Sequence, residues 1–275
     1  MERILAVDIG VGTQDIVVYD ASKNPENNIK LVLPAMTQII AKRIRRSKRD
    51  IFVRGETMGG GPLSMAVGEH IKKGHSVMMT PDAAVSIRDN LDEVREMGVE
   101  IVDDEPRSGK FDIIETKDFD FEGLLDFLSN IGEDTNFDSI GIAVQDHGYA
   151  VGKSDREFRF EKFREALENG ADLSKFLYKE PPDYFSRMNA TLRTAKRFSS
   201  GPVFAVDTKI AAIAGAIHDV KERPIMPMDI GNGHTMAALI GEEFEIFGLM
   251  EHHTWLLNEE KLGDMLIRFA DGELT

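Results

Sequence analysis

Residues 1–16 read Met-Glu-Arg-Ile-Leu-Ala-Val-Asp-Ile-Gly-Val-Gly-Thr-Gln-Asp-Ile. An apolar run at residues 4–7 ends at Asp8, and a second apolar-rich run follows at residues 16–19 after a turn with two glycines. This pattern predicts a β-hairpin. Glycines let backbone N–H groups approach an anion because no Cβ is in the way. A carboxylate at a strand end suits a hydrated Mg²⁺. The stretch therefore predicts a turn that handles phosphate and metal.

Nearly the same pattern recurs late in the chain. Residues 229–235 read Asp-Ile-Gly-Asn-Gly-His-Thr, between apolar runs at residues 225–228 and 236–240. Compared with the Asp-Ile-Gly-Val-Gly-Thr of residues 8–13, this stretch carries one inserted residue. Two such hairpins predict two related lobes whose turns face each other across a cleft.

The bulk composition restricts the class of protein. The chain has 275 residues, 42% of them hydrophobic, which suits one large or two medium domains. The net charge of −15 argues against a general binder of nucleic acid or of anionic membranes. The absence of cysteine removes disulfides, thiolate nucleophiles and Cys-ligated zinc or iron–sulfur sites. No run approaches the roughly 18 apolar residues of a membrane span, and the chain opens on a strand. We expect a cytoplasmic protein with no nucleic-acid or membrane partner.

The interior of the chain alternates between predicted strands and helices. Strands at residues 51–54, 76–79 and 99–102 are separated by helices at residues 63–72 and 83–97, which predicts an α/β arrangement with parallel strands. The first of these strands runs into Gly59-Gly60-Gly61. This turn lacks the Lys-Ser/Thr of a P-loop, so a structural turn and a ligand contact both remain open.

Three other features are candidates for a site. Polar residues Gln145, Asp146 and His147 follow a buried-type strand, where α/β proteins place ligand contacts. Asp207 precedes an Ala-rich helix at residues 209–218, where it is either a helix N-cap or a functional carboxylate. His252 and His253 are adjacent and would point to opposite faces of a strand, which disfavours a shared metal.

A basic cluster ends the helix predicted at residues 36–49. It consists of Lys42, Arg43, Arg45, Arg46, Lys48 and Arg49. We interpret it as a solvated helix end with cations near the C-terminus, with a patch for phosphate or a partner as the alternative.

The two turns and the segment after Asp207 together resemble the superfamily of actin, sugar kinases and heat-shock chaperone ATPases. The stretches at residues 8–14 and 229–235 look like its two phosphate motifs, and residues 207–215 are similar to its connecting segment. The resemblance implies a two-lobed, ribonuclease H-like α/β fold of mixed sheets flanked by helices. Residues 1–200 would form the first lobe, with an insert at about 30–135, and residues 201–275 the second. We expect the second lobe to be incomplete, because no Gly-Gly adenosine motif follows it.

The resemblance also implies roles for individual residues. Asp8 and Asp229 would hold Mg²⁺, Asp207 would be the first candidate for a catalytic carboxylate, and Asp146 the second. Phosphate groups of ATP would contact the two turns at Gly10, Gly12, Thr13, Gln14, Gly231, Asn232, Gly233 and Thr235. The function implied is that of an ATP-binding phosphotransferase or ATPase; the phosphoryl acceptor, a small molecule or a protein, stays open.

Within that superfamily, the chain looks like an archaeal family labelled as pyruvate formate-lyase activating enzymes. Such an enzyme is a radical-SAM protein that needs three Cys for its cluster, and this chain has none, so we disfavour that activity. Two alternatives to an ATPase remain: a non-catalytic switch or scaffold that binds a nucleotide or another anion, and a Rossmann-like binding protein that uses the Gly59-Gly60-Gly61 turn.

Overall fold

The chain divides into two compact units, each made of two stretches of sequence. The computed structural model describes residues 2–106, 111–168 and 172–274. The first unit comprises Met1–Ile142 and Glu180–Val203, and the second comprises Ala143–Lys179 and Phe204–Thr275. The expected division at residue 200 lies near one of the three points where the chain passes between units. Residues 107–110 of the expected insert lie outside the described residues.

The first unit begins with an antiparallel meander of three strands. These are β1 (Arg3–Ile9), β2 (Thr13–Asp20) and β3 (Ile29–Pro34), with a short 3-10 helix, η1 (Pro25–Asn27), before β3. In the sheet order, β8 (Ser139–Val144) follows β1 on the side away from β2. Alternate residues of β1 are buried, namely Leu5, Val7 and Ile9, because successive side chains of a strand point to opposite faces. The predicted hairpin is confirmed.

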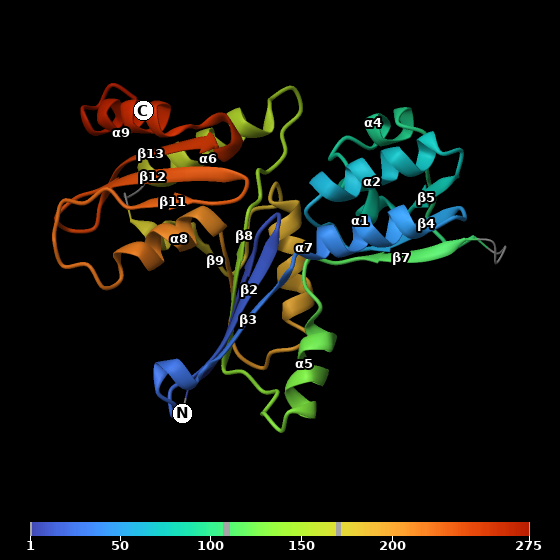
Figure 1. Cartoon of the computed structure of the whole chain (residues 1–275), viewed down its shortest axis with the longest axis horizontal. Coiled ribbons are helices and arrows are strands. Elements are labelled where there is room, and N and C mark those ends of the chain that lie inside the picture. Colours follow the sequence, from blue (N-terminus) through green and yellow to red (C-terminus); the bar gives the residue numbers. More distant parts are fainter. Residues whose placement is uncertain (1, 107–110, 169–171, 275) are drawn as a thin grey trace. The chain divides into compact units, whose positions relative to one another are not determined.

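A second part of the first unit is a parallel α/β layer. Its four strands lie in the order β6 (Val99–Ile101), β5 (Val77–Met79), β4 (Ile51–Gly55) and β7 (Asp112–Thr116). Figure 1 shows α1 (Met36–Arg46) and α2 (Gly61–Lys72) side by side next to this sheet. Ile40 of α1, Leu63 of α2 and Val53 of β4 share one core. The predicted alternation of helices and parallel strands is confirmed.

The prediction of a single helix at residues 83–97 is wrong. The structure has two short helices there, α3 (Pro81–Val85) and α4 (Leu91–Glu96). Asn90 is the N-cap of α4, and its side chain accepts a hydrogen bond from the amide of Asp92 at 3.0 Å. Asparagine is favoured at an N-cap, so Asn90 begins a new helix where the apolar pattern alone indicated a continuous one.

Two further helices complete the first unit. They are α5 (Phe121–Asn130) and α7 (Ser186–Ala195). Asp118 precedes α5 and forms an ion pair of 2.7 Å with Arg187 of α7. Asp118 also accepts a hydrogen bond from the hydroxyl of Thr191, one turn further along α7. These bonds join the chain stretch before residue 142 to the stretch after residue 180.

The second unit is built on another antiparallel meander. Its strands are β11 (Met228–Ile230), β12 (His234–Ile240) and β13 (Ile246–His253), and β9 (Leu177–Tyr178) pairs separately with β10 (Val203–Val206). The helices are α6 (Asp155–Glu168), α8 (Thr208–Ile217) and α9 (Glu259–Ala270), with two 3-10 turns, η2 (Leu173–Phe176) and η3 (Thr254–Leu256).

The middle strand of this meander supplies two cores. Met236 belongs to one core with Phe163 of α6 and Ile213 of α8, whereas Ala237 belongs to another with Phe269 of α9. Figure 1 accordingly shows α8 and α9 on different sides of the β11–β12–β13 sheet. The sheet is therefore covered on both faces. Across the described part of the chain, no helix combines the length and apolar character that crossing a membrane requires.

One expected strand of the second unit has different bounds. The strand expected at residues 225–228 begins only at Met228, because Pro227 has no N–H to donate to a ladder. The third strand of the meander, β13, begins at Ile246 and continues to His253. Phe244 has a φ of 65°, a left-handed conformation typical of a turn.

Candidate phosphate turns and a histidine-rich pocket

The two glycine turns have the same backbone hydrogen bond. The amide of Gly10 donates to the carbonyl of Thr13 at 2.9 Å, and the amide of Gly231 donates to the carbonyl of His234 at 3.0 Å. The turns therefore have equal length. His234 takes the place of Thr13, so the extra residue counted from the sequence is not an insertion in the turn.

The likeness extends to the third strand of each meander. Ala35 follows β3, and its amide donates to the carbonyl of Gly12 at 3.0 Å. Thr254 follows β13, and its amide donates to the carbonyl of Gly233, also at 3.0 Å. The repeat thus comprises three strands, and in each copy the end of the third strand holds the glycine turn.

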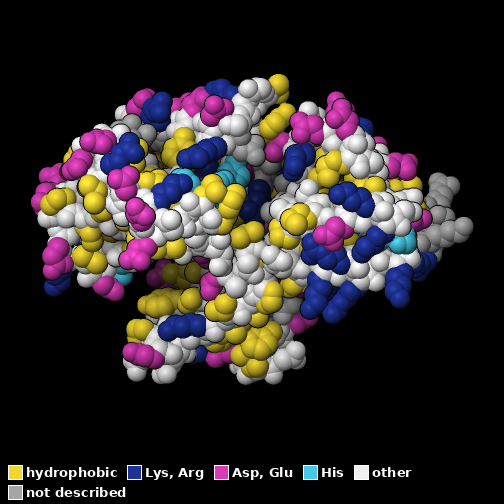
Figure 2. All heavy atoms as spheres, turned by 45° about the horizontal axis from the view of Figure 1, so that its top comes forward, with side chains coloured by type: hydrophobic (Ala, Val, Ile, Leu, Met, Phe, Trp, Pro, Cys, Tyr) yellow, Lys and Arg dark blue, Asp and Glu magenta, His cyan; other side chains and the backbone are white. Residues whose placement is uncertain are grey.

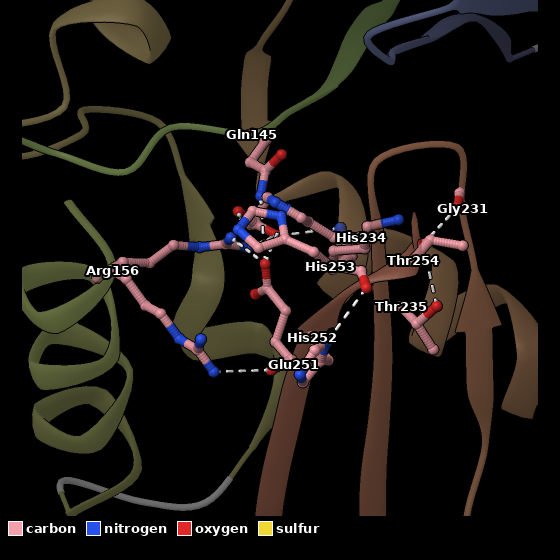
Figure 3. Close-up of polar contacts among 12 residues, drawn as sticks. Gln145, Arg156, Gly231, His234, Thr235, Glu251, His252, His253 and Thr254 are labelled. Atoms are coloured by element: carbon pink, nitrogen blue, oxygen red, sulfur yellow. Dashed lines mark hydrogen bonds and ion pairs between the residues drawn. The ribbon is translucent and has the colours of Figure 1, made fainter. Parts of the chain in front are cut away.

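The side chains of Gln14 and Thr235 are used inside the hairpins. Both are buried, with 3% and 1% of their surface exposed. Gln14 donates to the carbonyl of Pro34 at 2.9 Å. The Thr235 hydroxyl lies 3.1 Å from that of Thr254, which donates to the carbonyl of Gly231 at 2.7 Å (Figure 3). We expected phosphate contacts from both side chains, whereas the structure uses them to hold the turns.

The tips of the two turns are accessible. Val11 is 47% exposed, and Asn232, its counterpart in the second turn, is also exposed. Each tip is followed by a glycine, Gly12 or Gly233, so backbone groups there can approach a ligand without interference from a Cβ. Gly12, Thr13 and Gly233 are partly exposed.

Asp229 is bound to a cation of the chain itself. Its Oδ2 lies 2.5 Å from Nζ of Lys209, which comes from the first turn of α8. The same ammonium group lies against Gly231, because a Cβ built there would be 2.3 Å from Lys209 Nζ. A metal ion at Asp229 would have to displace Lys209, whereas an anion at the turn would meet a positive charge already in place. Asp8, in the first hairpin, pairs with Asp15 in the strand register.

No set of metal ligands is assembled in advance. Across residues 2–106, 111–168 and 172–274, no group of three or more His, Asp or Glu side chains is placed to hold a metal ion. Mg²⁺ needs only one or two carboxylates when phosphates and waters supply its other ligands. The second turn therefore fits a phosphate group directly, and fits Mg²⁺ only in company with one.

Asp207 is enclosed by its partners. It is 3% exposed, and both carboxylate oxygens accept hydrogen bonds from Nη2 of Arg159, at 3.0 and 2.9 Å. Its Oδ1 also accepts the amide of Lys209 at 2.9 Å, which caps α8. Burial raises the pKa of Asp207, although the charge of Arg159 opposes the rise. The geometry is that of a structural cap and ion pair.

Arg159 joins Asp207 to a second buried carboxylate. Its Nη1 donates to Oε1 of Glu251 at 2.8 Å, and Nδ1 of His234 lies 2.9 Å from the same oxygen. Burial alone would raise the pKa of Glu251, but the hydrogen bond with His234 and the charge of Arg159 outweigh it, so the pKa is lowered. Gln145 completes the cluster, with its Nε2 2.7 Å from His234 Nδ1. When Nδ1 of His234 carries a proton, it donates to Glu251; when it does not, it accepts from Nε2 of Gln145. It therefore bonds to only one of the two residues at a time.

The residues after β8 divide between the cluster and the loop. Gln145 reaches His234, and the ring of His147 lies 6.1 Å from that of His234, centroid to centroid. Asp146 is buried, and its Oδ1 accepts the amide of Gly148 at 2.9 Å, so it shapes the loop.

A pocket of about 200 Å³ opens beside this cluster. It is lined by His147, Arg156, Arg159, Phe160, His234, Glu251, His252 and His253. Figure 3 shows His234, Glu251 and Arg156 converging from the sheet and from α6. In Figure 2, histidine side chains reach the surface of the second unit beside Lys or Arg side chains.

The sequence reasoning missed Arg156, Arg159 and Glu251. The two arginines are three positions apart, so they lie on one face of α6, and that spacing was the available signal. Glu251 is a charged residue in a strand whose neighbours Leu249 and Met250 are buried. Nothing in the sequence relates this glutamate to α6.

Two other candidates are occupied structurally. The amide of Gly59 donates to Asp118 at 3.1 Å, and a Cβ at Gly60 would be 1.6 Å from the carbonyl oxygen of Ser86. The glycine run therefore serves a close approach of two backbones.

In the basic cluster of α1, Arg45 pairs with Glu69 at 2.9 Å. Figure 2 shows many Lys and Arg side chains gathered on this part of the first unit.

The fold and site define a class of α/β protein: two units with parallel and antiparallel sheets flanked by helices, each with a three-stranded meander closed by a glycine turn. The chain belongs to the family described as "Putative pyruvate format-lyase activating enzyme (DUF1786)", whose model matches residues 58–275. The activity in that description requires cluster ligands, and this chain contains no cysteine.

The other comparisons add little. No curated protein matches the chain. One solved structure, a putative O-methyltransferase from Klebsiella pneumoniae, is 14% identical over 84% of this chain and 81% of that chain. Its TM-score of 0.18 is too low to support any argument about fold or function.

Proposed function

We propose that the chain binds the phosphate groups of a nucleotide, ATP with Mg²⁺, at its two glycine turns, in the manner of the actin-like ATPase superfamily. The repeated meander carries this proposal. Gly10 and Gly231 make the same bond, and the amides of Ala35 and Thr254 hold the two turns in the same way. A superfamily defined by two equivalent phosphate hairpins accounts for such a repeat.

The surroundings of the second turn support phosphate as the ligand. Lys209 Nζ lies next to Gly231, where it can neutralise a phosphate oxygen. With a phosphate oxygen paired to this ammonium group, Asp229 would be available to hold hydrated Mg²⁺, and Asp8 would do so from the first hairpin. The bound nucleotide supplies the phosphoryl group, and the chain supplies charge and orientation.

A non-catalytic switch is the second candidate, and the position of Asp207 favours it. Hydrolysis requires a group that orients water, and both oxygens of Asp207 are occupied by Arg159. Asp146 is committed to the amide of Gly148. Under this alternative the chain binds ATP without releasing phosphate.

Titration calorimetry with Mg-ATP tests the proposal. Asp8→Asn should weaken binding by about tenfold or more, equivalent to about 1.4 kcal/mol. Asp126→Asn is the matched control, since Asp126 is exposed on α5 and belongs to neither hairpin. A phosphate-release assay then separates an ATPase from a switch. If the wild-type protein binds no nucleotide at millimolar concentration, the proposal fails.

A further inference from the structure

The pocket of the second unit adjoins the second glycine turn, because His234 both lines the pocket and accepts the closing bond of that turn. It lies where His234 and His253, paired across β12 and β13, meet Arg156 of α6. Its volume of about 200 Å³ is below the range for drug-sized ligands, about 300–1,000 Å³. A ligand of this pocket is therefore a small group.

The pocket has the character of an anion site. Arg156 and the rings of His147, His234, His252 and His253 line it together with one carboxylate, Glu251, whose partner Arg159 is shared with Asp207. Desolvation lowers the pKa of His253, the nearby His234, Arg156 and His252 lower it further, and Glu251 opposes them. The ring of His253 is therefore neutral near neutral pH, and its N–H can donate to the oxygens of a small anion alongside the guanidinium of Arg156.

Glu251 adds a second requirement to the ligand. Its Oε2 is buried and has no hydrogen-bond partner among the described residues. The low pKa of Glu251 keeps it ionised near neutral pH, so Oε2 can only accept. Leaving a buried acceptor without a donor costs free energy. A ligand that brings a proton to this oxygen would recover that energy.

The orientation of the Glu251 carboxylate is fixed by Arg159. Arg159 gives Nη1 to Oε1 of Glu251 and Nη2 to both oxygens of Asp207. Arg159 is 2% exposed, so this arrangement does not depend on solvent. Arg159 is therefore a positioning residue, and Oε2 is the oxygen left for a ligand.

We propose that this pocket binds a hydrogen phosphate group, whose anionic oxygens face Arg156 and the histidines and whose P–OH donates to Glu251. A deprotonated carboxylate or a sulfate has acceptors only, so neither satisfies Oε2. Inorganic phosphate has both kinds of group near neutral pH, because HPO₄²⁻ and H₂PO₄⁻ each keep at least one P–OH beside their anionic oxygens. The proposal goes beyond the proposed function and requires neither nucleotide nor Mg²⁺.

The test is calorimetric titration with inorganic phosphate and with sulfate, in the absence of nucleotide and metal. We expect phosphate to bind at least tenfold more tightly than sulfate. Glu251→Gln replaces an acceptor by an amide that can donate, so the preference for phosphate should disappear while sulfate binding strengthens. Methyl phosphate is the third ligand: above its second pKa of about 6 it has no P–OH, so at pH 8 it should bind at least tenfold more weakly than inorganic phosphate, and equal binding would overturn the proposed donor to Glu251.

Two further variants test the same proposal even if Glu251→Gln does not fold. Arg156→Gln should weaken phosphate binding at least tenfold. Arg164→Gln, on an exposed position of the same helix, should leave it unchanged. Equal binding of phosphate and sulfate by the wild type would overturn the proposal, and so would binding of neither at millimolar concentration. A separate titration with Zn²⁺ adds a third such outcome: saturation by the metal together with no response to phosphate. Because ATP is absent, failure here is distinct from failure of the nucleotide proposal.

Discussion

The backbone amides of Gly10 and Gly231 make equivalent hydrogen bonds, to Thr13 at 2.9 Å and to His234 at 3.0 Å, in hairpins that belong to different units. A Cβ at either glycine would lie 3.0 Å from the carbonyl oxygen that accepts this bond. The two turns thus share their length, their closing bond and their need for a small residue.

Loss of the Thr254 hydroxyl should loosen the second turn only. This hydroxyl donates to the carbonyl of Gly231 and contacts Thr235, whereas its counterpart in the first meander is Ala35. Thr254→Val should lower the free energy of unfolding by about 1–2 kcal/mol, since it removes one bond and leaves buried polar groups unpaired. Urea unfolding measures the loss. Thr254→Ser keeps the hydroxyl and should be nearly neutral; equal losses for both variants would contradict this account.

Removal of the Arg159 guanidinium should be much more costly. Arg159→Met leaves Asp207 and Glu251 buried without their common cation, which costs about 3–5 kcal/mol. The expected result is a large drop in the urea midpoint of the second unit.

Neutralising the carboxylates should reverse that drop. Adding Asp207→Asn and Glu251→Gln to Arg159→Met removes the uncompensated charges, and we expect more than half of the loss to be recovered. If the triple variant is no more stable than Arg159→Met, the loss arises from packing and not from charge.

The glycine run of the first unit offers a matched pair of substitutions. A Cβ at Gly60 would be 1.6 Å from the carbonyl oxygen of Ser86, whereas one at Gly61 has no neighbour within 4 Å. Gly60→Ala should therefore destabilise the protein by about 3 kcal/mol or more, through a backbone clash. Gly61→Ala should change stability by no more than about 0.5 kcal/mol. Thermal unfolding of the two variants checks this, and similar midpoints would refute the close approach.

His70 should make the first unit sensitive to mild acid. It is 1% exposed, and its Nε2 lies 2.8 Å from the carbonyl oxygen of Arg49. Burial lowers the pKa of His70 below the usual 6.5. The unfolded chain therefore binds the proton more readily, and stability should fall as pH drops below about 6.5.

His70→Gln is the variant that isolates this effect. Its amide can still donate to Arg49 but does not titrate. The free energy of unfolding, measured from pH 8 to pH 5, should depend less on pH in this variant than in the wild type. An identical slope in both proteins would assign the acid sensitivity to other groups.

The hairpins were predictable from the sequence because their determinants are local. Apolar runs, a carboxylate and two glycines fix the strands and turn around Gly10, and the same signs recur around Gly231. The break between α3 and α4 was missed because apolar periodicity continued through a region where Asn90 caps a new helix. Local competition between a cap and a continuing helix is decided by packing.

The Arg159 cluster was not predictable, since its partners are far apart in the sequence. Asp207 was singled out, but its two oxygens are satisfied by Arg159, an arginine 48 positions earlier in the chain. The second stretch was counted as one residue longer than the first, and the strand register shows that His234 takes the place of Thr13. Long-range pairing and register depend on the whole fold and leave no local mark.

The division of each unit into two stretches of sequence has a consequence for synthesis on the ribosome. The first unit includes Glu180–Val203, so α7 must emerge before Asp118 can pair with Arg187. By then the stretch Ala143–Lys179 has also been made, with Arg159 in it, although Asp207 and Glu251 are still to come. Nascent chains generally fold domain by domain as they emerge, but here the arginine waits without its carboxylates until translation has passed residue 251. The buried ion-pair cluster of the second unit can therefore form only after its C-terminal stretch has been made.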